Sequence, residues 1–365
     1  MVQLWFAGNI FMPTLPARAL RAFCLLFSLA LILSVAARAE LVWTSETGWR
    51  IEGGALSGLS GPEGRNAIEL MNKGRKAEEK NSRGSAISAY KKVSKKYPNS
   101  IYAPEALYRA ARLYLARKQY NKSFTFFQDM ISRYPNTPRF NEVIGEQYRI
   151  ASALLDGARP RYWGWIPGFK NREKGLEYFE VVLFNAPYSD YAPLALMNVA
   201  RGHQKFKNTE EAIDALDRMI NNYPQSLLAP DAYIQLAKTH ASLVDGPEYD
   251  QTSTKEAATY FEDFIILFPN DPNIAAAATG QAKMKTVLAE SKITMGDFYF
   301  YKRSNWVAAK VFYNEAITAY PDSPVAEKAK KRLAAVEADM ASRMPQIGPD
   351  GRPIMPKKKK FLWIF

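Results

Sequence analysis

Few residues in this 365-residue sequence have the type and spacing that catalysis requires. The two histidines, His203 and His240, each fall within a predicted helix and have no ligand spacing to each other. Zinc-protease, serine-hydrolase, P-loop and dinucleotide motifs do not occur in the sequence. The carboxylate pairs Glu78-Glu79 and Glu210-Glu211 are typical of helix surfaces and first turns, where they complement the helix dipole. We therefore expect a protein that performs no chemistry of its own, without cofactor or metal.

The N-terminus has the features of a secretory signal peptide. Arg18 and Arg21 precede an apolar run of about 14 residues, 22–35, and residues 37–39 fit the small-residue rule for cleavage before Glu40. The run is shorter than the roughly 20 residues that span a bilayer. We therefore expect removal of residues 1–39 and a mature protein outside the cytoplasm.

Removal of that segment also decides the charge and the redox chemistry of the mature chain. The segment contains three arginines, so the net charge of +13 falls to about +10. It also contains the only cysteine, Cys24, so no disulfide can form afterwards. The positive charge suits an acidic protein partner or an anionic membrane surface. A secreted location argues against nucleic acid as a partner.

One short phrase recurs along the chain, as in Tyr97-Pro98-Asn99-Ser100. Its prolines are Pro98, Pro135, Pro187, Pro224, Pro269 and Pro321. Their intervals of 37 to 52 residues fit a period of about 34 residues with insertions, which is typical of helix-turn-helix solenoids. Proline ends a helix because it lacks the N–H and its ring strikes the preceding turn. The Asn, Ser, Thr or Asp that follows is expected to cap the next helix.

The segments between the phrases have helical periodicity, with alanines on first helices and aromatics such as Phe124 and Phe127 on second helices. This pattern predicts an all-α tetratricopeptide-repeat solenoid over 62–343, built of five to six helix-turn-helix units. Its halves are 62–187 and 190–343. The expected units are 62–98, 102–135, 138–187, 190–224, 227–269 and 272–321, followed by a C-terminal capping helix at 324–343 with a polar outer surface.

Two segments lie outside the predicted solenoid. Residues 40–61 are rich in glycine and serine and include Trp43 and Trp49, so we expect a mostly irregular lead segment. Residues 344–365 form a basic-aromatic tail that is expected to be disordered alone. The tail suits an anionic membrane surface, a partner's groove or no role at all. The residues that would make these contacts are Lys357, Lys358, Lys359, Lys360, Trp363 and Phe365.

Two further segments have the composition of partner-binding surfaces. The third unit contains an insertion, 159–169, whose aromatics stand among prolines and glycines. Such loops often bind partners, although the aromatics could equally fill a groove of the superhelix. The sixth unit begins with a long helix, 272–303, whose basic and aromatic end suits a protein interface. The alternative is repeat core with a solvated face. The candidates are Tyr162, Trp163, Trp165 and Phe169 in the insertion, and Lys283, Lys285, Lys292, Arg303 and Trp306 in the sixth unit.

These residues resemble the BamD family, the tetratricopeptide-repeat component of the bacterial outer-membrane β-barrel assembly machinery. Residues 162–169, followed by Asn171-Arg172-Glu173 and a helix at 175–183, are similar to that family's third-repeat insertion. Residues 297–309, with a paired aromatic helix end before Trp-Val-Ala, are similar to its last-repeat turn. The resemblance covers most of 62–340, and its repeat phrase is shared with many periplasmic proteins.

The resemblance implies a periplasmic location on the inner face of the outer membrane. Family members dock their C-terminal repeats on the barrel-forming subunit and receive unfolded barrel substrates with their N-terminal repeats. Carried across, Arg303 and Trp306 lie in the docking half. The receiving groove would include Tyr90, Tyr108 and Tyr114. Family members carry a lipid on a cysteine at the mature N-terminus, where this chain has Glu40. The basic-aromatic tail is a hypothetical substitute for that lipid.

Two other functions remain open from the sequence. A TolA-binding-like periplasmic adaptor has similar repeats but usually an N-terminal coiled coil, and no heptad run precedes Pro62. A cell-wall-active helical enzyme, such as a lytic transglycosylase, would need a carboxylate in a shaped cleft. Glu146 and Glu180 are its candidates, and no surrounding motif supports either residue.

Overall fold

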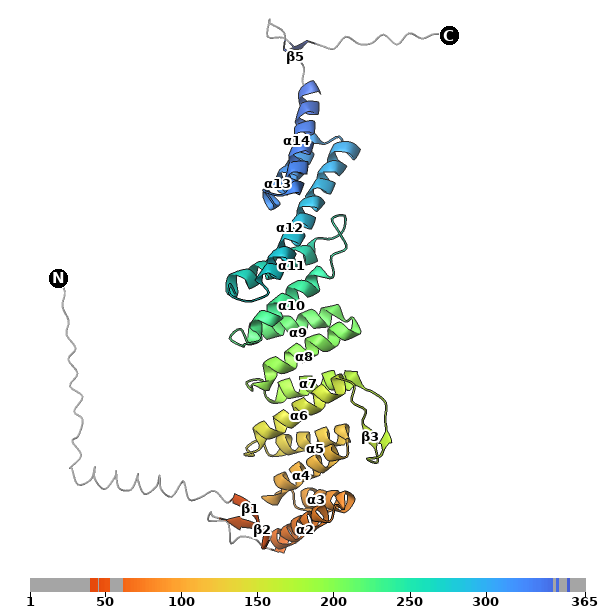
Figure 1. Ribbon diagram of the computed structural model, residues 1–365, viewed down its shortest axis with the longest axis vertical. Helices are drawn as coiled ribbons and strands as arrows, with labels where there is room; N and C mark the ends of the chain where they lie inside the picture. The colour runs from red at the N-terminus through yellow and green to blue at the C-terminus, as the bar shows by residue number, and fades with distance from the viewer. Residues whose placement is uncertain (1–39, 45, 53–61, 344–345, 348–352, 355–365) are drawn as a thin grey trace, which may run out of the picture. The chain divides into compact units, whose positions relative to one another are not determined.

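The computed structural model describes residues 40–44, 46–52, 62–343, 346–347 and 353–354 (Figure 1). The expected signal peptide, and the tail residues from Lys357 to Phe365, lie outside the described residues. The chain divides into two compact units. The N-terminal unit is Met1–Ile150 with Gly157–Asn171, and the C-terminal unit is Ala151–Asp156 with Arg172–Phe365.

The N-terminal unit consists of helices that pack on one another in chain order, with two short hairpins. Its helices are α2 (Pro62–Glu79), α3 (Arg83–Lys96), α4 (Tyr102–Ala116), α5 (Tyr120–Arg133) and the first part of α6 (Phe140–Leu155). Within it, α2 packs on α3, α3 on α4 and α4 on α5, as Figure 1 shows. The antiparallel hairpins are β1 (Glu40–Thr44) with β2 (Gly48–Glu52), and β3 (Arg161–Tyr162) with β4 (Ile166–Pro167).

The C-terminal unit continues the same arrangement of packed helix pairs. Its elements are α7 (Arg172–Asn185), α8 (Tyr191–Phe206), α9 (Thr209–Asn222), α10 (Ala229–Ala241), α11 (Thr252–Leu267), α12 (Ile274–Asp297), η1 (Phe298–Lys302), α13 (Trp306–Ala319) and α14 (Pro324–Arg343). A short antiparallel pair, β5 (Gln346–Ile347) with β6 (Pro353–Ile354), follows α14. The predicted all-α repeat solenoid is confirmed. In the N-terminal unit α2 pairs with α3 and α4 with α5, and in the C-terminal unit α8 pairs with α9, α10 with α11 and α12 with α13, with α14 as the last helix.

Two elements differ from their sequence-based expectations. A single helix is expected over 272–303, but the α-helix α12 ends at Asp297 and the π-helical turn η1 follows it. The lead segment 40–61 is expected to be irregular, but residues 40–52 form the β1–β2 hairpin. The hairpin is held by tertiary contacts, because the buried Trp49 donates its backbone N–H to Asn72 Oδ1 at 2.8 Å. The Arg75 guanidinium also lies 4.1 Å from the centre of the Trp43 ring.

The repeated phrases form tight turns, and most do not cap the next helix as expected. In the first five phrases the backbone N–H of the fourth residue donates to the first carbonyl, as Ser226 does to Tyr223 at 3.0 Å. In the last phrase the Ser323 hydroxyl donates to the Tyr320 carbonyl at 2.7 Å. A side-chain cap occurs at Ser323, whose Oγ accepts from the Ala326 N–H at 3.1 Å. Ser226 and Asp271 instead accept from the N–H two residues on, because the next helix begins three residues later. The capping prediction is wrong at these two phrases.

Tyrosines of the phrases also connect one repeat to the next. The Tyr223 hydroxyl donates to the Pro187 carbonyl at 2.6 Å, and the Tyr134 hydroxyl donates to the Pro98 carbonyl in the same manner. Each bond satisfies a carbonyl that proline leaves outside a helix. The phrase therefore ends a helix and also ties its turn to the preceding turn.

At several places a glycine of one helix faces an aromatic ring of a neighbouring helix. A Cβ atom added to Gly74 of α2 would lie 2.5 Å from the ring of Tyr90 on α3. A Cβ atom added to Gly296 of α12 would lie 2.5 Å from the ring of Tyr313 on α13. Both rings are fully buried, so they have no room to move aside.

Replacement of Gly74 by alanine is expected to destabilise the protein. Overpacking of a buried site typically costs about 1–3 kcal/mol, which exceeds the gain of about 0.5–1 kcal/mol from helix propensity. Urea denaturation followed by circular dichroism measures the free energy of unfolding. Gly84→Ala in α3 is the control, because nothing lies within 4 Å of its added Cβ, and a small stabilisation is expected there. Equal stability changes for the two variants would contradict the packing argument.

Candidate functional site

The first helices of the N-terminal pairs carry a ladder of alternating charges, which we call the charge ladder. It runs from α2 across α4 to α6 and joins Arg75, Glu78, Arg109, Glu105, Arg139, Glu142, Arg112, Glu146 and Arg149. Arg109 links two helices, since it contacts Glu78 at 3.3 Å and Glu105 at 2.8 Å. The proposed catalytic candidate Glu146 is one member, in contact with Arg112 and Arg149, so its carboxylate is engaged in ion pairs.

The three tyrosines expected in a receiving groove occupy different environments. Tyr90 is fully buried in the core between α2 and α3 and has no surface that a substrate could contact, so its assignment to a groove is wrong. Tyr108 is also largely buried, and its hydroxyl donates to Glu142 of the charge ladder and accepts from Arg112 at 3.1 Å. Tyr114 has little exposed area, but part of it lines a surface groove.

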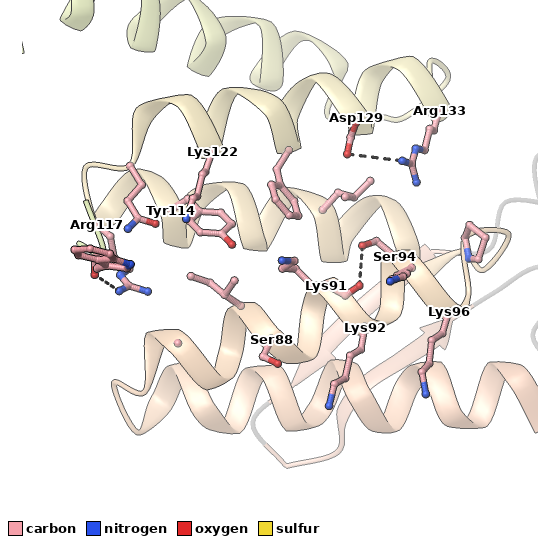
Figure 2. Close-up of a pocket in the computed structure, with 18 residues that line it drawn as sticks. Ser88, Lys91, Lys92, Ser94, Lys96, Tyr114, Arg117, Lys122, Asp129 and Arg133 are labelled. Atoms are coloured by element: carbon pink, nitrogen blue, oxygen red, sulfur yellow. Dashed lines mark hydrogen bonds and ion pairs between the residues drawn. The ribbon is translucent and has the colours of Figure 1, made fainter. Parts of the chain in front are cut away.

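That groove is a cavity of about 700 Å³ in the N-terminal unit, which we call the α3–α5 groove. One face of α3 forms a wall, with Ser88, Lys91 and Lys95 at helical spacing. The opposite wall is α5, and the end of α4 supplies Tyr114. Figure 2 shows Lys92 and Lys96 on the α3 side and Lys122 and Arg133 on the α5 side.

The inserted loop completes one end of the α3–α5 groove. The Arg117 guanidinium donates to the Trp163 carbonyl, and the Arg161 N–H donates to the Lys118 carbonyl at 2.9 Å. Gly164 has a φ of +90°, and a Cβ there would lie 2.5 Å from Arg117 Nε, so both the turn and the contact require glycine. The α4–α5 turn thus places Trp163 at the groove, together with Tyr114.

The other aromatics of the insertion lie exposed around this contact. The side chains of Tyr162, Trp163, Trp165 and Phe169 are 55%, 68%, 72% and 87% exposed. They do not bury themselves in a groove of the N-terminal unit, which was the alternative to partner binding. Their contact with a partner remains a prediction.

In the C-terminal unit, the predicted partner-binding residues separate into partly buried, paired and exposed groups. Trp306 packs against the core, donates from Nε1 to Asp339 at 2.6 Å and lies under the Arg343 guanidinium. Lys292 pairs with Glu315 at 2.5 Å. Lys283 and Arg303 are exposed, and Lys285 is half-buried. Trp306 therefore holds α13 and α14 together and offers a partner little surface.

Exposed apolar side chains occur on two successive elements next to these residues, Phe298 and Tyr301 on η1 and Val307 and Val311 on α13, and we call this set the η1–α13 face. These side chains are between 42% and 67% exposed. Arg332 of α14 fixes one edge, because it donates to the Tyr301 hydroxyl and contacts Asp297 at 3.5 Å. The sequence-based prediction named Arg303 and Trp306 in this region and did not name Val307 or Val311, and partner binding by any of them stays a prediction.

Metal-ligand clusters and membrane-spanning helices are both absent from the part of the chain that the structure describes. The described residues contain no group of three histidine, cysteine, aspartate or glutamate side chains that could hold a metal ion. None of their helices combines the length and the apolar character that a membrane span needs.

Comparison with known families agrees with this architecture. Residues 170–346 match the YfiO family, described as an outer membrane lipoprotein, and residues 105–137 match a tetratricopeptide-repeat family. The first match includes nearly the whole described C-terminal unit, with α7 to α14. No curated protein matches the sequence.

Several solved repeat proteins are similar at low identity. A tetratricopeptide-repeat protein from Parabacteroides merdae is 15% identical over 75% of this chain and 100% of its own, with a TM-score of 0.30. A repeat protein from Bacteroides fragilis is 15% identical over 75% and 98%, with a TM-score of 0.35. MamA from Desulfovibrio magneticus is 17% identical over 58% and 98%, with a TM-score of 0.29.

The helix pairs and the repeat-family match define a tetratricopeptide-repeat protein. More particularly, residues 170–346 match the model of the YfiO, or BamD-type, family, which confirms the resemblance to the BamD family. The matched family is described as an outer membrane lipoprotein. Such repeat proteins are non-catalytic adaptors that mediate contacts between proteins.

Glu142 makes the stability of the N-terminal unit depend on pH. Burial alone would raise its pKa, but hydrogen bonds from Tyr108 and Arg139 lower the pKa below its ordinary value. A lowered folded-state pKa stabilises the protein above the unfolded-state pKa of about 4.3, and this contribution is lost as the pH falls through the folded-state value.

We expect Glu142→Gln to melt at a lower temperature than the wild-type protein at pH 7. Below the folded-state pKa of Glu142 the wild-type side chain is also neutral, so the two melting temperatures should converge. The effect at pH 7 should be about 0.2–1 kcal/mol, because the side chain is 42% exposed and solvent screens the ion pairs. Thermal unfolding from pH 7 to pH 3 measures it. Glu69→Gln is the control, because Glu69 is exposed and has no ion pair in the described structure. If the difference in melting temperature between the wild-type protein and Glu142→Gln were the same at pH 3 as at pH 7, the stability would not depend on the ionisation of Glu142.

Proposed function

We propose that the chain is a periplasmic adaptor of the outer-membrane β-barrel assembly machinery. It works on the inner face of the outer membrane, binds the barrel-forming subunit and performs no catalysis. The observation that carries this proposal is the YfiO match over residues 170–346, which includes nearly all of the described C-terminal unit. Under this proposal, the N-terminal unit is the part that receives unfolded barrel substrates.

The η1–α13 face is the surface that we assign to the barrel-forming subunit. Its apolar side chains are exposed beside the exposed cations Lys302 and Arg303, a composition typical of protein interfaces. The face is rigidly supported, because the fully buried Tyr313 donates to Asp297 at 2.6 Å and Asn305 caps α13. A docking partner would therefore meet a preformed surface, which reduces the ordering cost of binding.

The two carboxylates that were candidates for catalysis are both engaged in ion pairs, which favours an adaptor over an enzyme. An acid-base mechanism needs a carboxylate poised near a substrate, whereas Glu146 is largely buried and shared by two arginines. Glu180, the other candidate, pairs with Arg218 at 2.9 Å. Both carboxylates serve the contacts between neighbouring helices.

The test is an affinity pull-down of the full chain from solubilised native envelopes, with identification of the bound proteins by mass spectrometry. We expect a large β-barrel protein that bears periplasmic repeat domains. Val307→Asp/Val311→Asp should reduce its recovery at least about tenfold, because charges placed on an apolar interface must be desolvated. Ile266→Asp/Leu267→Asp is the matched control, with two exposed aliphatic residues at the end of α11.

Recovery of Tol-type envelope proteins without a barrel assembler would replace the proposal by the TolA-binding-like alternative. Equal loss of the barrel protein with both double variants would contradict the assignment of the η1–α13 face. Circular dichroism of each variant establishes that the helices have folded.

A further inference from the structure

The α3–α5 groove concentrates positive charge, most of which has no carboxylate partner among the described residues. Its lining includes seven cations and one carboxylate: Lys91, Lys92, Lys95, Lys96, Arg117, Lys122 and Arg133, with Asp129. Asp129 lies 3.8 Å from Arg133, so it is already engaged. The four lysines of α3 have no carboxylate partner within the part of the chain that the structure describes. In the charge ladder of the same unit, by contrast, every arginine has a carboxylate partner.

The spacing of these lysines works against the stability of α3. Lys91 with Lys95, and Lys92 with Lys96, are like charges four residues apart, an arrangement that destabilises a helix by about 0.2–0.5 kcal/mol per pair. The helix dipole favours Lys95 and Lys96, which lie in the last turn. It does not account for Lys91 and Lys92, or for Lys122 across the groove. A ligand with negative charges would offset the repulsion.

The floor of the groove is apolar, which distinguishes it from a flat basic surface. Ile87 and Leu107 are buried beneath it, and the rings of Tyr114 and Phe126 lie 5.2 Å apart. The exposed Trp163 stands at its end, held by Arg117. A planar lipid surface cannot reach such a floor, whereas an apolar side chain of a peptide can.

The dimensions suit a short extended segment. From Gly84 to Lys96, α3 runs for about 18 Å at 1.5 Å per residue. An extended peptide covers that length with about five or six residues at roughly 3.3 Å each. Alternate side chains of such a peptide point in opposite directions, so one set can meet the floor while acidic side chains meet the lysines.

We propose that the α3–α5 groove binds an extended acidic peptide segment of a partner protein, with one apolar side chain seated beside Tyr114 and Trp163. This goes beyond the proposed function, because it assigns the charge and conformation of a ligand to the N-terminal unit, whatever protein supplies that segment. Its test uses no envelope partner, so either proposal can fail while the other stands.

The experiment measures fluorescence anisotropy of a labelled peptide of about eight residues, with glutamates flanking a phenylalanine, titrated with the full chain. We expect saturable binding that weakens as salt rises from about 50 to 300 mM. The same peptide with glutamines should bind at least about tenfold more weakly. Lys91→Gln/Lys95→Gln should weaken binding of the acidic peptide about tenfold without a loss of thermal stability, since it removes a repulsive pair.

Matched controls separate the groove from general charge. Lys328→Gln/Lys331→Gln removes two exposed lysines of α14 in the C-terminal unit and should leave binding unchanged. Trp163→Ala should weaken binding several-fold, because it removes an exposed ring from the end of the groove. Equal binding of the acidic and glutamine peptides, or equal effects of the two lysine pairs, would overturn the proposal. So would vesicles of anionic lipid that bind through Lys91 and Lys95 while the acidic peptide does not.

Discussion

The close approach of neighbouring helices at a glycine and an aromatic ring is the constraint on which the rest of the structure depends. At Gly74 and Tyr90, and again at Gly296 and Tyr313, the space of a side chain on one helix is occupied by a ring from the next. This approach fixes the distance between α2 and α3. The charge ladder begins on α2, next to this contact. It also fixes α12 against α13, where Tyr313 and Asp297 support the η1–α13 face.

Local signals predicted the repeat fold, because each helix ends at a proline and its apolar residues follow a helical period. They could not predict how the turns are made. At Lys118, Lys207 and Ser304, residues without a preference for the left-handed region adopt positive φ between paired helices. The β1–β2 hairpin was missed for a similar reason, since Trp49 is held by Asn72 of α2 and not by its neighbours in sequence.

Residue type located the candidate surfaces only in part. The aromatic insertion and Tyr114 were chosen separately, and the structure brings Trp163 and Tyr114 to one groove through Arg117. Tyr90 was misjudged, because sequence does not distinguish a tyrosine that fills the space above a glycine from one that lines a groove. The lysines of the groove were overlooked, although their like-charge spacing on α3 was visible in the sequence. Whether a lysine has a partner depends on the neighbouring helices.

We propose that the two units present separate binding surfaces for different polypeptide segments. The most direct measurement is photo-crosslinking in cells from a photoreactive residue placed at Val307 on the η1–α13 face or at Ser88 in the α3–α5 groove, with the crosslinked peptides sequenced. The account predicts that Val307 reaches a folded periplasmic domain of a β-barrel protein and that Ser88 reaches an acidic extended segment. Adducts from both positions at the same partner site, or a Ser88 adduct with a segment that lacks acidic residues, would contradict it.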